Sequence, residues 1–203
     1  MLNKNVSIAL ILVFFGSCTF IGKKLIGYKP AEPKTFNQQI KLAKKLKIFQ
    51  YPIFELDTNY MKFLDLKFSD KLDSKLFYQP LQVYYFDTSG VLYSFHNNCM
   101  YPGFPIIKWN YFNAFDTFPP KNIKKDIPDL KFSFKEISTY LKPINSKAKL
   151  FSETSNILIV VYNKSLLKQS KYLVNNIFSN YKNKNVHFIF CNNDLFLSHH
   201  SIF

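Results

Sequence analysis

The sequence contains no arginine and is poor in glycine, tryptophan and acidic residues. Its 27 basic residues are all lysines and stand against 13 acidic residues, which gives a formal net charge of +14. Arginine is the side chain best suited to bidentate contacts with phosphate and guanine, so its absence argues against a nucleic-acid partner. The lysines are scattered in short clusters, which is typical of solvated faces. The alternative is that some of them lie against anionic lipid headgroups.

Glycine and proline are absent from the first apolar stretch of the chain. Lys4 precedes an uninterrupted apolar run over residues 8–15, which ends at Gly16, Ser17 and Cys18. A charged start, an apolar run too short to span a bilayer and small residues before a cut site are typical of a secretory signal peptide. The sequence therefore predicts a signal peptide over residues 1–17.

The tripeptide Gly16-Ser17-Cys18 resembles the lipobox of bacterial lipoproteins, although Phe15 stands where the common pattern has leucine. In that family the cysteine is acylated and becomes the first residue after cleavage. The resemblance implies a lipid such as palmitate on Cys18. It also implies a cell-envelope location, with the protein membrane-anchored and facing the periplasm or the exterior. The alternative is an uncleaved N-terminal anchor in which Cys18 is a buried apolar residue.

The segment after Cys18 differs in composition from the rest of the chain. Residues 18–34 contain two glycines and two prolines with little apolar periodicity, which predicts a lipid-anchored tether. The remaining residues, 35–203, have the length of a single α/β domain. Apolar periodicity predicts N-terminal helices over residues 37–49 and 60–72.

A β-hairpin is predicted over residues 81–95. Two runs rich in β-branched and aromatic residues flank Asp87-Thr88-Ser89-Gly90, where aspartate starts the turn and glycine supplies the left-handed position. The next stretch, residues 97–131, combines prolines with many aromatic residues. Prolines forbid a long regular element, and the aromatics are too many for a solvated loop, so we expect a long ordered loop that folds back over the domain.

The C-terminal part of the chain predicts a βαβ unit over residues 156–194. Two continuous apolar runs, residues 157–162 and 186–191, flank an amphipathic helix over residues 166–181. Before this unit, Ser133 and Glu136 have capping-box spacing, which predicts a helix that continues through Leu141 and ends at Pro143.

This βαβ stretch resembles the core of the thioredoxin-like fold. In redox-active members the first strand leads into a Cys-x-x-Cys motif at the helix N-terminus. Residues 163–167 of this chain occupy that position and contain no cysteine. The resemblance implies a thioredoxin-like core and argues against disulfide exchange at this helix.

Cys99 and Cys191 remain after lipidation of Cys18. They are candidates for a disulfide or a redox pair in an oxidising compartment; otherwise Cys191 is a small buried apolar residue and Cys99 a loop thiol. His96 and Cys99 have a spacing that metals use, and Cys191, His199 and His200 are the further ligand candidates. Structural zinc sites show two closely spaced ligand pairs, so we expect no metal site and no cofactor.

The aromatic loop is the predicted binding region. Trp109 and Tyr111, with His96 and Asp116 nearby, are candidates to line a groove for a peptide, a glycan or a partner protein. The alternative is that these aromatics only fill the space above the sheet. A triad of Cys99, His96 and Asp116 can be drawn, but chance supplies such patterns readily, so we expect no catalytic residues.

The sequence as a whole predicts an α/β protein with a thioredoxin-like βαβ core, an added β-hairpin, a long ordered loop and N-terminal helices. The predicted function is a lipid-anchored envelope protein that acts as a binding or assembly module without catalysis. The alternative function is an envelope thiol redox protein that uses Cys99 and Cys191.

Overall fold

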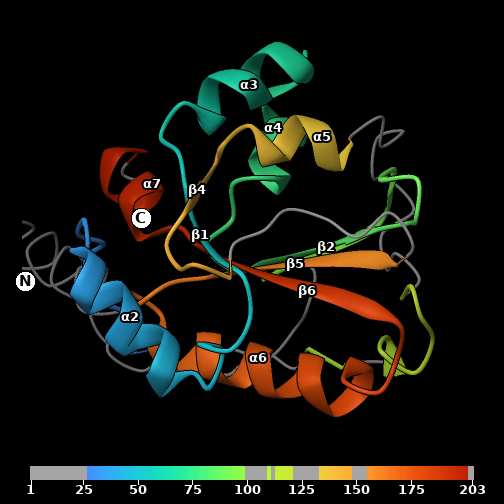
Figure 1. Cartoon of the computed structure of the whole chain (residues 1–203). Coiled ribbons are helices and arrows are strands. Elements are labelled where there is room, and N and C mark those ends of the chain that lie inside the picture. The colour runs from blue at the N-terminus through green and yellow to red at the C-terminus, as the bar shows by residue number, and fades with distance from the viewer. Residues whose placement is uncertain (1–26, 99–108, 111–112, 121–132, 148–154, 201–203) are drawn as a thin grey trace, which may run out of the picture.

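A computed structural model describes residues 27–98, 109–110, 113–120, 133–147 and 155–200. Within these residues six strands form one mixed sheet in the order β3-β2-β5-β6-β1-β4 (Figure 1). The strands are β1 (Ile53–Leu56), β2 (Gln82–Phe86), β3 (Leu92–Asn97), β4 (Leu141–Pro143), β5 (Asn156–Tyr162) and β6 (Val186–Asn192). The helices are α2 (Phe36–Lys45), α3 (Tyr60–Lys67), α4 (Lys71–Leu76), α5 (Phe134–Ser138), α6 (Leu167–Tyr181) and α7 (Asp194–His200).

Three parallel strands form the middle of the sheet. β6 pairs in parallel with β5 on one side and with β1 on the other. β2 is antiparallel to β5, and β4 is antiparallel to β1. Residues 157–162 of β5 are all buried, as expected for a central strand covered on both faces. The apolar run that predicted this strand therefore reflects its place in the middle of the sheet.

Helices cover both faces of the sheet (Figure 1). α2 and α6 lie on one face, and α3, α4 and α5 lie on the other. α6 buries Leu173, Val174 and Ile177 against the sheet, which is the apolar stripe of an amphipathic helix. α7 lies beside the edge where β5 and β6 end.

The predicted α/β architecture is confirmed, with β5, α6 and β6 in the order strand, helix, strand. The hairpin is also present as β2 and β3. Its turn forms as the sequence indicated, because the Asp87 carboxylate accepts hydrogen bonds from the Ser89 and Val91 backbone N–H groups, both at 2.9 Å. Gly90 has φ 78°, a left-handed conformation that glycine adopts without strain.

The helix that begins after Ser133 is shorter than predicted. The capping box is present, since Ser133 Oγ accepts from Glu136 N and Glu136 Oε2 accepts from Ser133 N. The helix ends at Ser138, however, and Leu141–Pro143 forms β4 instead of the last helical turn. Pairing with β1 outweighs local helix propensity here, and Pro143 is tolerated because β4 lies at the edge of the sheet.

The second predicted helix, over residues 60–72, is divided. α3 ends at Lys67, and Phe68 is extended, with φ −115° and ψ 120°. α4 then begins at Lys71. The break places Phe68 against Phe77, with ring centroids 4.7 Å apart, so packing of the two rings accompanies the interruption.

The predicted aromatic loop lies only partly within the described residues. Residues 99–108, 111–112 and 121–132 fall outside them. Trp109 and Phe115 are buried in the core, at 0% and 1% exposure. Across the described part of the chain, no helix has the length and hydropathy needed to cross a membrane.

Candidate functional site

The carboxyl ends of the parallel strands carry a cluster of polar residues. Asn163, Lys164 and Ser165 follow β5, and Asn193 and Asp194 follow β6. The carboxyl ends of adjacent parallel strands meet at one edge of the sheet, and ligands of α/β proteins bind most often at this edge. This edge is therefore the candidate functional site of the molecule.

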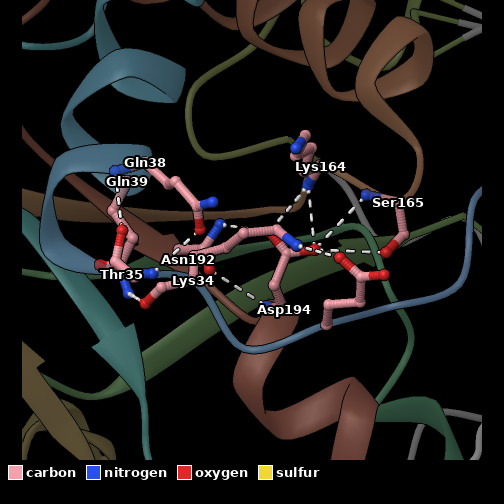
Figure 2. A network of polar contacts seen from close by, with 9 residues as sticks. Lys34, Thr35, Gln38, Gln39, Lys164, Ser165, Asn192 and Asp194 are labelled. Carbon is pink, nitrogen blue, oxygen red and sulfur yellow. Dashed lines mark hydrogen bonds and ion pairs between the residues drawn. The ribbon is translucent and has the colours of Figure 1, made fainter.

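Asp194 links the two strand ends (Figure 2). Its side chain is completely buried and accepts hydrogen bonds from the Lys164 backbone N–H at 2.9 Å and from Ser165 Oγ at 3.2 Å. Asn192 Nδ2 donates to the same carboxylate at 3.0 Å. A buried carboxylate is stable only when donors surround it, and here the donors come from the loop after β5 and the end of β6.

Asn163 makes a second link at the same edge. Its Oδ1 accepts from the Leu166 backbone N–H at 2.7 Å, which satisfies a donor at the start of α6. Its Nδ2 donates to the Pro80 carbonyl at 2.8 Å and to Asn193 Oδ1 at 3.2 Å. These buried polar groups bond to one another, so they hold the loops in place.

The chain before α2 crosses this edge. The Lys29 backbone N–H donates to the Ser165 carbonyl at 2.9 Å, and Gln39 Nε2 of α2 donates to the Lys34 carbonyl at 3.3 Å. The Lys34 side chain is only 5% exposed, and its Nζ lies 3.4 Å from Glu32 Oε2. Residues 28–34, the end of the predicted tether, therefore pack against the domain.

Two hollows of about 180 Å³ each lie at this edge, one between residues 29–34 and the loop after β5 and the other between α2 and the start of α6. Lys164 lines both of them. The first is also lined by Lys29, Pro30, Glu32, Lys34 and Ser165, and the second by Gln38, Lys41, Leu42, Lys45 and Leu167. Five lysines and one glutamate surround the pair, so the hollows favour an anionic group.

Glu55 is the one acidic residue of β1, and its side chain contacts α2. It accepts a hydrogen bond from Gln39 Nε2 of α2. Burial raises the pKa of the Glu55 carboxyl, and the charge of Asp194 adds to that rise, while the Gln39 hydrogen bond and Lys142 oppose it. Burial of this carboxylate is the main reason that the charged form is disfavoured.

The structure places two of the predicted binding residues in the core. Trp109 and His96 are both 0% exposed. The His96 ring stacks on Phe115 with centroids 5.7 Å apart. For Trp109, burial agrees with the alternative stated for the aromatics, in which they fill space above the sheet. Asp116 is exposed, and its backbone N–H donates to the Asn113 carbonyl at 3.1 Å. Tyr111 lies outside the described residues.

The two candidate redox cysteines cannot be placed together, because Cys99 lies outside the described residues. Cys191 is a free thiol in the middle of the sheet, completely buried, and burial strongly raises its pKa. Cys18 also lies outside the described residues.

The histidine ligand candidates His199 and His200 are on α7, and His200 Nε2 lies 3.0 Å from the Thr58 carbonyl oxygen. In the described part of the chain, no three His, Cys, Asp or Glu residues are grouped to hold a metal ion.

Sequence reasoning missed the polar edge, although a signal was present. Each of the two apolar runs of the βαβ unit is followed directly by asparagine and then by charged or polar residues: Asn163-Lys164-Ser165 and Asn192-Asn193-Asp194. Parallel strands place such residues at one edge. No local sequence pattern predicted that residues 28–34 would pack at this edge.

Comparisons of this chain with protein-family models, with curated proteins and with solved structures found no match.

Proposed function

We propose that this chain is a cell-envelope protein, lipid-anchored through Cys18, that acts as a binding or assembly module without catalysis. The observation that carries the proposal is the packing of residues 28–34 on the carboxyl edge of the parallel strands. A chain anchored nearby would hold the domain, and the basic hollows beside this segment, close to the membrane. The hollows are the contact region of the module.

Within the α/β architecture, we propose that β5, α6 and β6 form a thioredoxin-like core. The parallel pairing of β5 with β6 and the position of α6 on one face support it. At the point where redox members carry their cysteine motif, Asn163 uses its side chain to bond Leu166, Pro80 and Asn193. That role is structural and supports a module without thiol exchange at this helix.

The lipid anchor is tested by metabolic labelling with radioactive palmitate. We expect the wild-type chain to be labelled and Cys18→Ser to lose the label, because the thiol is the acylated group. Cys191→Ala is the matched control and should keep the label, since its thiol is buried in β6. Label retained by Cys18→Ser would overturn the proposed anchor.

The redox alternative is tested by thiol trapping. A catalytic cysteine must reach solvent and ionise, whereas Cys191 is buried and the pKa of its thiol is strongly raised. We expect maleimide to modify Cys191 in the native protein at least a hundredfold more slowly than in urea. Rapid native modification, or failure of Cys99→Ser/Cys191→Ser to complement a deletion, would support the redox function instead.

A further inference from the structure

Two helices on one face of the sheet carry only basic charge. Neither α2 nor α6 contains an acidic residue, and residues 33–54 and 154–193 contain none. Their lysines are exposed to solvent. We define the basic face as the exposed lysines on the two helices, Lys41, Lys44, Lys45, Lys168 and Lys171, together with Lys164 before α6.

The opposite face has mixed charge. Asp65 lies on α3 and Glu136 on α5, and Lys67 Nζ pairs with Glu136 Oε1 at 2.6 Å. AT-rich codon usage would raise lysine content along the whole chain. It gives no reason for α2 and α6 in particular to contain no acidic residue. A separation of charge between two faces is typical of a surface that meets a polyanion.

Exposed aromatic rings lie on the same elements as these lysines. Phe36 on α2 is 63% exposed, and Tyr172 on α6 is 41% exposed. Phe49, just after α2, is 39% exposed and has Lys44 Nζ 5.2 Å from its ring centroid. Lysines mixed with exposed aromatic rings are typical of surfaces that lie in the headgroup region of a bilayer.

The basic face is also next to the point where the chain enters the domain. Lys29 is hydrogen-bonded to Ser165, directly beside Lys164. Cys18 precedes Gly27 by nine residues, which span at most about 30 Å when fully extended. A domain of this length is roughly 40 Å across. This step rests on the proposed function: if Cys18 carries lipid, the tether is shorter than the domain and keeps the face beside Gly27 near the bilayer.

We propose that the basic face docks on the surface of an anionic phospholipid bilayer, with headgroup phosphates in the two hollows that share Lys164. At physiological salt the electrostatic potential of a charged membrane is screened over about 8 Å, so only the lysines that face the bilayer contribute to docking. Each such lysine contributes on the order of a fivefold gain in affinity. The exposed rings of Phe36, Phe49 and Tyr172 insert among the headgroups beside them.

The test is lysine footprinting on the full-length chain reconstituted with vesicles. One set of vesicles contains phosphatidylcholine with about a third phosphatidylglycerol, and the other contains phosphatidylcholine alone. A water-soluble acetylating ester reports the reactivity of each lysine by mass spectrometry. Lys41, Lys45, Lys164 and Lys168 are compared with Lys62, Lys75 and Lys135, which are exposed on α3, α4 and α5.

We expect acetylation of the basic-face lysines to slow at least threefold on the anionic vesicles and to recover in 0.5 M salt. The three lysines of the opposite face should react equally on both kinds of vesicle. Equal protection of both groups, or of neither group, would overturn the proposal. Protection found only in native envelope membranes, and not on protein-free vesicles, would also overturn it and would assign the face to an acidic protein partner.

A pair of matched variants adds a control for charge. In K41Q/K45Q/K168Q the protection of Lys164 should disappear, whereas in K62Q/K75Q/K135Q, which loses the same charge, it should remain. All six side chains are exposed, so both variants should unfold at the wild-type midpoint. The palmitate experiment is separate: a chain labelled on Cys18 without footprint protection rejects only the docking proposal, and protection without label rejects only the anchor.

Discussion

The Asp194 carboxylate accepts hydrogen bonds from two different parts of the chain. Lys164 and Ser165 lie about 30 residues before it and Asn192 lies two residues before it, yet all three donate to one buried group. Such a carboxylate contributes to stability only because every donor is already in position. The Asp194 side chain therefore joins the loop after β5 to the end of β6 at the carboxyl edge of the sheet.

Asp194→Asn should destabilise the folded protein by about 2 kcal/mol, because an amide group would place N–H donors against the donors that now face the carboxylate. Urea unfolding gives the measurement. Asp116→Asn is the control, since Asp116 is exposed, and it should change stability by less than about 0.5 kcal/mol. Equal midpoints for the two variants would show that the buried network does not support the fold.

Glu55 and Asp57 are two residues apart and have opposite pKa shifts. Burial raises the pKa of Glu55 from its usual value near 4.5. The hydrogen bond from Lys142 lowers the pKa of Asp57 from its usual value near 3.8, with Lys142 Nζ 2.6 Å from Asp57 Oδ2. The two carboxylates should therefore affect the pH dependence of stability with opposite sign.

Glu55→Gln should raise the melting temperature at pH 7 but not at pH 4. A raised carboxyl pKa means that the folded state binds the proton more tightly, so the wild type loses stability as pH rises from about 4.5 through the folded pKa. Glutamine removes that loss and still accepts the Gln39 hydrogen bond. Melting curves at half-unit pH steps test this, and a difference that does not change with pH would contradict it.

Asp57→Asn is the matched comparison and should behave in the opposite way. A lowered pKa stabilises the fold above about 3.8, and this contribution is lost as pH falls through the folded pKa. The variant should therefore melt below the wild type at pH 7, with a gap that closes toward pH 3. Because the Lys142 side chain is 60% exposed, the gap should correspond to less than about 1 kcal/mol.

At the scale of elements, the hairpin depends on one backbone conformation. Gly90 has φ 78°, and its N–H donates to the Asp87 carbonyl at 3.0 Å. A Cβ at this position would lie 3.6 Å from Phe134 Cβ, which is an ordinary contact. Any cost of a side chain at residue 90 therefore comes from the backbone and not from packing.

Gly90→Ala should destabilise the protein by about 1 kcal/mol, because alanine resists the left-handed region. Gly90→Asn should cost less, since asparagine adopts this conformation more readily. Denaturant unfolding of the two variants measures the difference. If alanine is tolerated as well as glycine, the turn is not held in the conformation described.

Element boundaries shift where two signals compete. The capping box at Ser133 predicted the start of α5 correctly, because the cap is made by residues three apart. The end of that helix was not predictable, because β4 forms by pairing with β1, a strand about 85 residues earlier in the chain. A local pattern carries no information about such a partner.

At the scale of the whole molecule, burial of Trp109 shows that part of the aromatic loop packs into the domain. Trp109 is the only tryptophan and is 0% exposed. Its fluorescence should be blue-shifted in the native protein, and acrylamide or iodide should quench it several-fold less than in the protein unfolded in urea. Equal quenching of the native and unfolded protein would place the ring in solvent.

The sequence by itself determined the surplus of lysine, the buried strands of the βαβ unit, the hairpin turn and the cap of α5. Each of these depends on composition or on residues close together in the chain, where periodicity and backbone preference act directly. Only the tertiary structure decided that Trp109 and His96 lie in the core and that residues 28–34 pack against the strand ends. It also decided that α2 and α6 gather their lysines on one face. These features depend on contacts between elements that are not neighbours in the chain, such as Lys29 with Ser165, and such contacts form when the sheet and its two helical layers pack together.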